Sequence, residues 1–113
     1  MLFRSEMLAN IALMAAEEVR RFGLPPKVAF LSHSNYGSSS RASAQKMRVA
    51  RELFAHMAPD IECDGELQGD AALSETVRRN SLLDTSFEGE ANLLICPNLD
   101  AANILFKIGR AHV

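Results

Sequence analysis

The sequence predicts an α/β fold in which a parallel sheet is flanked by helices. Segments with helical periodicity alternate along the chain with short runs that are apolar at consecutive positions. Strands of this kind are typical of a parallel sheet that is covered on both faces. Regular alternation with helices also implies right-handed crossovers between parallel strands. With 113 residues, the chain has the size of one domain or of part of one.

The first helix is predicted over residues 6–22, and the first strand over residues 27–32. Apolar residues of the helix recur at three- and four-residue steps, which places them on one helical face. The members of this face are Leu8, Ile11, Ala15, Val19 and Phe22. Gly23, followed by Pro25 and Pro26, ends the helix.

The rest of the chain continues the alternation. The predicted elements are a helix over 44–57, a strand over 61–64 that Gly65 ends, a helix over 70–80, a strand over 93–96 and a helix over 101–107. Residues expected to face the core are Met47, Ala50, Leu53, Phe54, Met57, Ala71, Leu73 and Val77.

Composition excludes several classes of protein. Twelve basic and 14 acidic residues give a net charge of −2, which argues against a nucleic-acid partner. The longest apolar run, residues 11–16, is far too short to span a bilayer, and we see no signal peptide. Cys63 and Cys96 are expected to be small buried hydrophobes in a reducing compartment. We therefore expect a cytoplasmic protein with no membrane partner.

Both ends of the chain resemble translated adapter DNA. Residues 1–5 can be encoded by ATG CTC TTC CGA TCT, and the complementary strand of the same DNA, in a shifted frame, encodes the Ile108-Gly109-Arg110 found near the other end. We therefore expect residues 1–5 and 108–113 to be non-native and residues 6–107 to be a partial domain.

Charge is divided along the chain. Residues 27–51 contain five bases and no acid, whereas residues 60–100 contain ten acids and two bases. This division is compatible with two solvated faces of opposite sign, or with an anion site beside the basic helix.

Three polar segments follow the three predicted strands, where parallel sheets bind ligands. They span residues 33–40, 64–70 and 97–103. In the first segment, Ser34, Gly37, Ser38 and the following Arg41 have the chemistry of a phosphate cradle at a helix N-terminus. Ser39 or Ser40 could equally cap that helix.

The other two segments offer carboxylates and amides. Asp64, Glu66 and Asp70 could bind a divalent metal, perform acid–base chemistry or hold loops together, and Asp70 could simply cap a helix. Asp64, Gln68, Asn98 and Asn103 are expected to shape the cleft floor, although the third segment could also be a cap. No metal-ligand spacing and no catalytic triad is visible, so we assign no metal ligand and no catalytic residue.

The same three regions resemble the phosphate acetyl/butyryltransferase family. The blocks that carry the resemblance are VAFLSHSNYGS at 28–38, DGELQGDAA at 64–72 and GEANLLICPNLDAAN at 89–103. Within the family, the sequence is most similar to the C-terminal phosphotransacetylase-like domains of bacterial NADP-dependent malic enzymes, as AAEEVRRFG at 15–23 indicates.

The resemblance implies a two-domain fold with a cleft between the domains, of which this chain is the second subdomain. It implies an acetyl-CoA-responsive regulatory and oligomerisation module in a homo-oligomeric enzyme that converts malate to pyruvate, with NADP and a divalent metal bound by upstream domains. The alternative is a piece of a genuine phosphate acetyltransferase. Either way, the expected ligand is an acyl-CoA or acyl phosphate, the rest of the parent chain is a partner, and this piece alone is expected to bind no resident cofactor and to be inactive.

Two departures from the transferase pattern favour the regulatory branch. Transacetylases typically have Pro-Asp-Leu-Asn where this chain has Pro97-Asn98-Leu99-Asp100, and they have Gly at the position of Ala102. The exchange moves a negative charge within the loop, and the added methyl group restricts close approach of a ligand or backbone.

Overall fold

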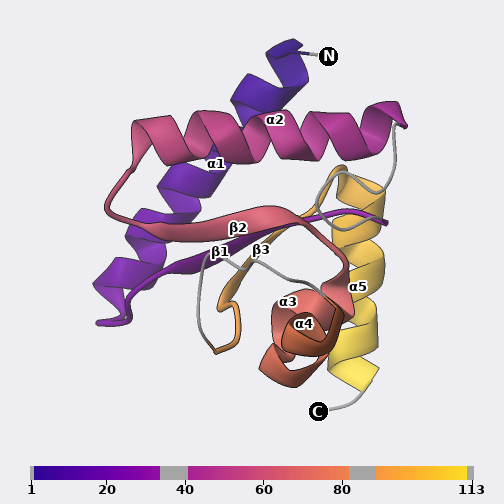
Figure 1. Cartoon of the computed structure of the whole chain (residues 1–113). Coiled ribbons are helices and arrows are strands. Elements are labelled where there is room, and N and C mark those ends of the chain that lie inside the picture. The colour runs from indigo at the N-terminus through magenta and orange to yellow at the C-terminus, as the bar shows by residue number, and fades with distance from the viewer. Residues whose placement is uncertain (1, 34–40, 82–88, 112–113) are drawn as a thin grey trace.

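The computed structural model describes residues 2–33, 41–81 and 89–111 and places five helices and three strands there. In chain order they are α1 (Leu2–Arg21), β1 (Lys27–Leu31), α2 (Ala42–Met57), β2 (Glu62–Leu67), α3 (Gly69–Leu73), α4 (Glu75–Ser81), β3 (Leu93–Ile95) and α5 (Leu99–Ala111). Figure 1 shows α2 above the sheet and α3 and α4 below it.

The sheet is parallel throughout, in the order β2-β1-β3. Val28 of β1 lies opposite Cys63 of β2 on one side and Leu93 of β3 on the other. The central strand is buried from Val28 onward because helices cover both of its faces. The predicted α/β class and the alternation of elements are therefore confirmed.

Helices α1 and α2 form the larger core with one face of the sheet. Phe30 and Phe54 are fully buried there, with their ring centroids 5.7 Å apart. The predicted inner face of α1 is wrong in part: Ala9, Ala12 and Ala16 are fully buried, whereas Ile11 is 50% exposed and Phe22 is 82% exposed. Of the predicted face, Leu8 packs against the core, and Ala15 and Val19 are half-buried. Small side chains allow two helices to approach closely, so the alanine stripe faces the core.

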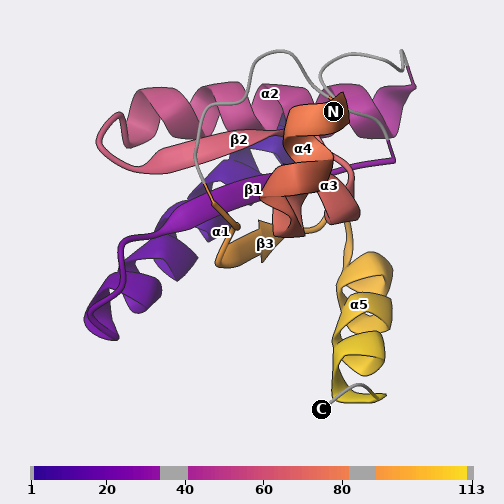
Figure 2. The same ribbon diagram turned by 60° about the horizontal axis from the view of Figure 1, so that its bottom comes forward.

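The opposite face carries a smaller core of Ala29, Leu31, Leu67, Ala71, Ala72 and Ala91. Leu105 of α5 packs against it, although Figure 2 shows α5 projecting away from the rest of the molecule. Leu73 and Met57 were expected in the core, but both are exposed. Each lies at the last residue of its helix, where the chain leaves the packed layer.

Two predicted boundaries are also corrected. Gly65 does not end β2, because the strand continues to Leu67. The predicted helix over 70–80 is broken at Ser74, whose hydroxyl accepts a hydrogen bond from the N–H of Val77 at 3.2 Å. This is the geometry of an N-cap, and it starts a second short helix.

No helix in the described residues is long and apolar enough to cross a membrane. Cys63 is buried and Cys96 is half-buried, as expected of small hydrophobes. Burial raises the pKa of both thiols.

Candidate functional site

The carboxyl ends of the three strands meet at one edge of the sheet. The amide of Gln68, directly after β2, donates to the carbonyl oxygen of His33, after β1, at 3.0 Å. The N–H of Ser32 donates to Leu67 at 2.8 Å, which joins the same two strand ends. A hollow of about 400 Å³ opens here between Ser32 and His33, Gly69, and the Pro97-Asn98 pair after β3. We call it the rim hollow.

Asn98 is held at this rim by the start of α5. Its side-chain oxygen accepts the N–H of Ala101 at 2.8 Å, so Asn98 caps the helix, as one of the two sequence interpretations proposed. The cap uses the oxygen of the amide group. The NH₂ group of Asn98 is the other polar end that this side chain can offer to a ligand.

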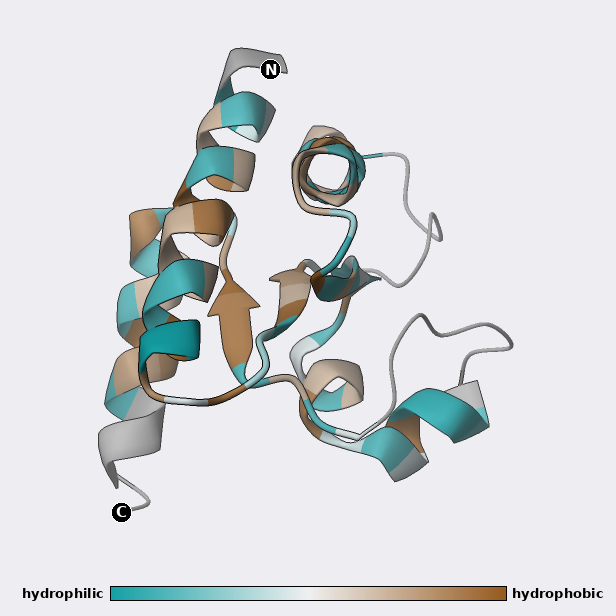
Figure 3. Ribbon diagram, turned by 90° about the vertical axis from the view of Figure 1, so that its left-hand side faces the viewer, coloured by the Kyte–Doolittle hydropathy of each residue, from teal (hydrophilic) through white to brown (hydrophobic). Residues whose placement is uncertain are grey.

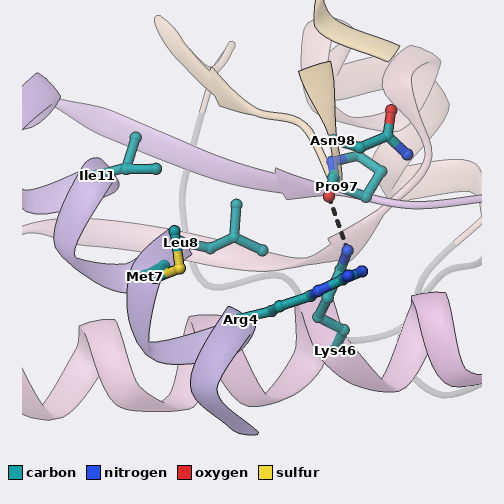
Figure 4. A pocket seen from close by; sticks show the side chains of 7 residues that line it. All are labelled: Arg4, Met7, Leu8, Ile11, Lys46, Pro97 and Asn98. Carbon is teal, nitrogen blue, oxygen red and sulfur yellow. Dashed lines mark hydrogen bonds between the residues drawn. The ribbon is translucent and has the colours of Figure 1, made fainter. Parts of the chain in front are cut away.

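Lys46 fixes the same loop from α2. Lys46 is buried as a residue, and its ammonium group donates to the carbonyl oxygen of Pro97 at 2.7 Å. Burial, followed by the nearby Arg4, lowers the pKa of Lys46. Figure 4 shows these two cations and the apolar side chains of Met7, Leu8 and Ile11. With Pro97 and Asn98 they line a hollow of about 350 Å³. The rim hollow is lined by residues that follow all three strands, where parallel sheets bind ligands, so we place the candidate ligand site there.

The basic helix α2 does not present all its charge to a ligand. Arg48 binds both carboxylate oxygens of Glu66, at 2.6 and 3.2 Å, and Glu66 is completely buried. The hydrogen bond to Glu66 is the main reason that the pKa of Arg48 is raised. Part of the charge division along the sequence is therefore an internal ion pair between α2 and β2, which neither sequence interpretation anticipated.

Other predicted residues lie at different depths. Asp64 is buried within β2, and its carboxylate accepts the N–H of Gly65 at 2.9 Å. Arg41 is exposed at the N-cap position of α2, and Asn103 is exposed on α5. The predicted Ser34, Gly37 and Ser38 lie outside the described residues.

The structure places Gln68 at the N-cap position of α3, so Asp70 is not the cap. Asp70 lies in the first helical turn, and its carboxylate accepts the N–H of Ala71 at 2.8 Å. Among the described residues, no group of three or more His, Cys, Asp or Glu side chains is placed to hold a metal ion.

Sequence analysis missed the buried Arg78. Its guanidinium donates to the carbonyl oxygens of Ala71, at 3.0 Å, and of Gly89, and it is fully buried. Glu75 accepts the N–H of Gly89. These bonds hold the chain before β3 against α3. Nothing in the amino-acid pattern distinguishes Arg78 from the neighbouring Arg79, which is exposed.

Comparison with known proteins identifies the family. Residues 4–112 match the model of the phosphate acetyl/butaryl transferase family. The chain belongs to this family. The resemblance found in the sequence is thereby confirmed, and the match covers all three strands of the sheet.

Both malic enzymes and phosphate acetyltransferases are similar to this chain. The chain is 53% identical to the NADP-dependent malic enzyme of Escherichia coli, over 94% of its own length and 14% of the enzyme's, and equally identical to a Rhizobium meliloti malic enzyme named for NAD. It is 39% identical to a phosphate acetyltransferase of Acetivibrio thermocellus, covering 92% of this chain and 32% of that protein. The chain thus spans about one seventh of the malic enzymes and one third of the transferase.

A solved structure has the same fold. The EutD phosphotransacetylase of Staphylococcus aureus superposes with a TM-score of 0.90 and 35% identity, covering 95% of this chain and 34% of that one. The described arrangement of sheet and helices is therefore that of one part of a phosphotransacetylase.

Proposed function

We propose that this chain is part of the phosphotransacetylase-like C-terminal domain of an NADP-dependent malic enzyme. The whole enzyme would oxidatively decarboxylate malate to pyruvate, with NADP and a divalent metal bound in its other domains. The observation that carries the proposal is the 53% identity to malic enzymes, against 39% to a phosphate acetyltransferase over a similar length. The Rhizobium relative named for NAD makes the choice between the two nicotinamide cofactors a matter for assay.

We further propose that this domain senses acetyl-CoA at the rim hollow. Backbone N–H groups at the start of α2, together with Arg41 and the predicted Ser34, Gly37 and Ser38, would bind its phosphates. Asn98 lines this hollow and uses its side-chain oxygen to cap α5, so its NH₂ group is the end that would donate to the ligand.

Regulation requires more than binding. Acetyl-CoA would have to bind one arrangement of a cytoplasmic homo-oligomer more tightly than another, because equal affinity shifts no equilibrium. The sensing role is therefore tested in the intact parent enzyme.

The deciding experiment measures malate oxidation by the intact parent as acetyl-CoA is titrated, with both NADP and NAD. Arg41→Ala is expected to weaken the acetyl-CoA response at least several-fold while leaving the rate without effector unchanged. Arg21→Ala is the matched control, because Arg21 is exposed at the end of α1 that leads to the amino end of β1. An unchanged response in Arg41→Ala would remove Arg41 from the proposed site and favour a purely structural domain.

The second candidate is a genuine phosphate acetyltransferase, favoured by the TM-score of 0.90 to a phosphotransacetylase. It predicts acetyl phosphate formation from acetyl-CoA and phosphate by the intact parent. Robust turnover in that assay would contradict the regulatory role.

A further inference from the structure

Lys46 holds one wall of the rim hollow from outside it. Its ammonium nitrogen donates to the carbonyl oxygen of Pro97 at 2.7 Å, as the dashed line in Figure 4 shows. Pro97 and Asn98 line the rim hollow, and they also line the neighbouring hollow that contains Lys46. The Pro97-Asn98 pair is therefore a wall shared by two hollows, and Lys46 contacts it without lining the rim hollow itself.

The same face of α2 reaches the rim hollow directly. Ser43 lines this hollow and lies three residues before Lys46 on the helix. Residues three apart are neighbours on one helical face. Helix α2 thus borders the hollow through Ser43 and holds the wall next to α5 through Lys46, so the bond to Pro97 sets the distance between these two parts of the rim.

The burial of Lys46 is unfavourable in itself. Figure 3 views α2 nearly end-on and shows that this helix carries both hydrophilic and hydrophobic residues. Lys46 belongs to its buried side, whose other members are Ala44, Met47, Ala50 and Phe54. Taking an ammonium group out of water costs free energy that an apolar side chain of similar length would not. What lysine adds at this position is a donor directed at Pro97.

The bond to Pro97 fixes the residue that follows. A peptide group is planar, so holding the carbonyl of Pro97 also fixes the direction in which the chain enters Asn98. Asn98 then caps α5: its side-chain oxygen accepts the N–H of Ala101 at 2.8 Å, and its main-chain oxygen accepts the N–H of Ala102 at 3.2 Å. The orientation of the Asn98 amide group therefore depends on both the cap and Lys46.

We propose that Lys46 is a positioning residue for the ligand of the rim hollow. By holding the Pro97 carbonyl, Lys46 keeps the NH₂ group of Asn98 directed at bound acetyl-CoA, and it acts through Asn98 without touching the ligand. This role rests on the proposed function, because it requires that acetyl-CoA binds in the rim hollow.

Amide hydrogen exchange in this 113-residue chain tests the structural step without a ligand. Lys46→Met removes the donor and should accelerate exchange at the amides of Ala101 and Ala102 by at least about fivefold, with the amides of β1 unchanged. Lys107→Met is the matched control, because Lys107 is exposed on α5, and it should change neither set. Unchanged exchange at Ala101 and Ala102, or equal acceleration throughout β1, would overturn the positioning role.

The acetyl-CoA response of the intact parent enzyme tests the functional step. Lys46→Met should raise the half-maximal acetyl-CoA concentration by at least about fivefold. Lys46→Arg retains a donor and should restore it to within about twofold, because the hollow of about 350 Å³ beside Lys46 has room for the larger side chain. Asn98→Ala should also weaken the response, and adding Lys46→Met to it should have less than about a twofold further effect.

The outcomes separate this role from the proposed function. Absence of any acetyl-CoA response in the unsubstituted parent would overturn both. A response that Arg41→Ala weakens and Lys46→Met leaves unchanged would overturn the role of Lys46 alone. Fully additive effects of Lys46→Met and Asn98→Ala, or no recovery in Lys46→Arg, would also contradict it, because Lys46 would then not act through Asn98 by donating to Pro97.

Discussion

Helices α1 and α5, the first and the last of the described chain, are packed very differently. Helix α1 buries a full stripe of alanines between α2 and the sheet, and the buried Ser5 adds a hydrogen bond to the carbonyl oxygen of Lys46 at 3.0 Å. Helix α5 packs through Leu105 and leaves Leu99, Ile104 and Phe106 exposed. The first helix is packed into the larger buried core, whereas the second leaves several large apolar side chains exposed. Stability and partner binding should therefore respond to different substitutions.

The largest effect on stability is expected from Phe54→Ala in the larger core. Phe54 is fully buried and packs on Phe30, so the cavity should cost about 3–5 kcal/mol of unfolding free energy. Urea unfolding followed by circular dichroism measures it. Phe22→Ala is the control, because Phe22 is 82% exposed and should change stability by less than about 0.5 kcal/mol. Equal losses would contradict the assignment of α1's inner face.

A slightly smaller effect is expected from breaking the internal ion pair. Arg48→Met leaves the carboxylate of Glu66 buried without its cation, at a cost of about 3 kcal/mol. Adding Glu66→Gln should restore most of the loss, because it removes the buried charge. Arg21→Met breaks an exposed pair with Glu18 and should cost less than about 1 kcal/mol. Failure of the double variant to recover would show that the pair contributes more than charge neutralisation.

Gly65→Ala tests the close approach of β2 and β1. Gly65 has a φ of +142°, and an added Cβ would lie 2.7 Å from the carbonyl oxygen of Phe30. We expect a loss of about 1–3 kcal/mol. Gly69→Ala is the control, because a Cβ there meets no atom within 4 Å. A thermal melt in which both variants match the parent chain would show that the strands can separate without cost.

Acid stability is expected to depend on Glu75. The N–H of Gly89, with smaller contributions from Arg79 and Arg78, lowers the pKa of Glu75 below its ordinary value of 4.5. The stabilisation is therefore present above that value and lost as the pH falls through the lower folded-state pKa. Glu75→Gln should flatten the decline of the urea midpoint between about pH 6 and pH 3, whereas the exposed Glu17→Gln should leave it unchanged.

The smallest effect on stability is expected from a substitution on the exposed surface of α5. Leu99 is 74% exposed, so Leu99→Lys should change the unfolding free energy of this chain by less than about 0.5 kcal/mol. A large loss of stability in the chain alone would mean that α5 is already packed in solution.

Much of the fold was predictable because the strands are apolar on both faces. Continuous apolar runs at 27–32 and 93–96 located β1 and β3 to within a residue. The inner face of α1 was not predictable in this way, because two stripes of the helix satisfy the same spacing. Side-chain size favoured the stripe with Ile11, whereas close packing against α2 selected alanine. Gly65 was misjudged because glycine marks both turns and close backbone contacts.

The candidate site was predictable only where it depends on topology. The strand-end rule correctly placed Gln68 and Asn98 at one edge of the sheet. The buried Lys46 and Arg78 were missed, because their burial depends on carbonyl oxygens distant in the sequence or attached to residues of any type. Main-chain acceptors leave no trace in the amino-acid pattern.

The contacts of Arg78 have a consequence for sequence variation. Its guanidinium binds main-chain oxygens, which every residue carries, so these two bonds by themselves demand no particular side chain at positions 71 and 89. Position 78 has no such freedom, since its two terminal nitrogens serve different carbonyl groups and a single ammonium cannot reproduce their spacing. An apparently ordinary arginine in an acidic stretch would thus be a residue that natural variation spares.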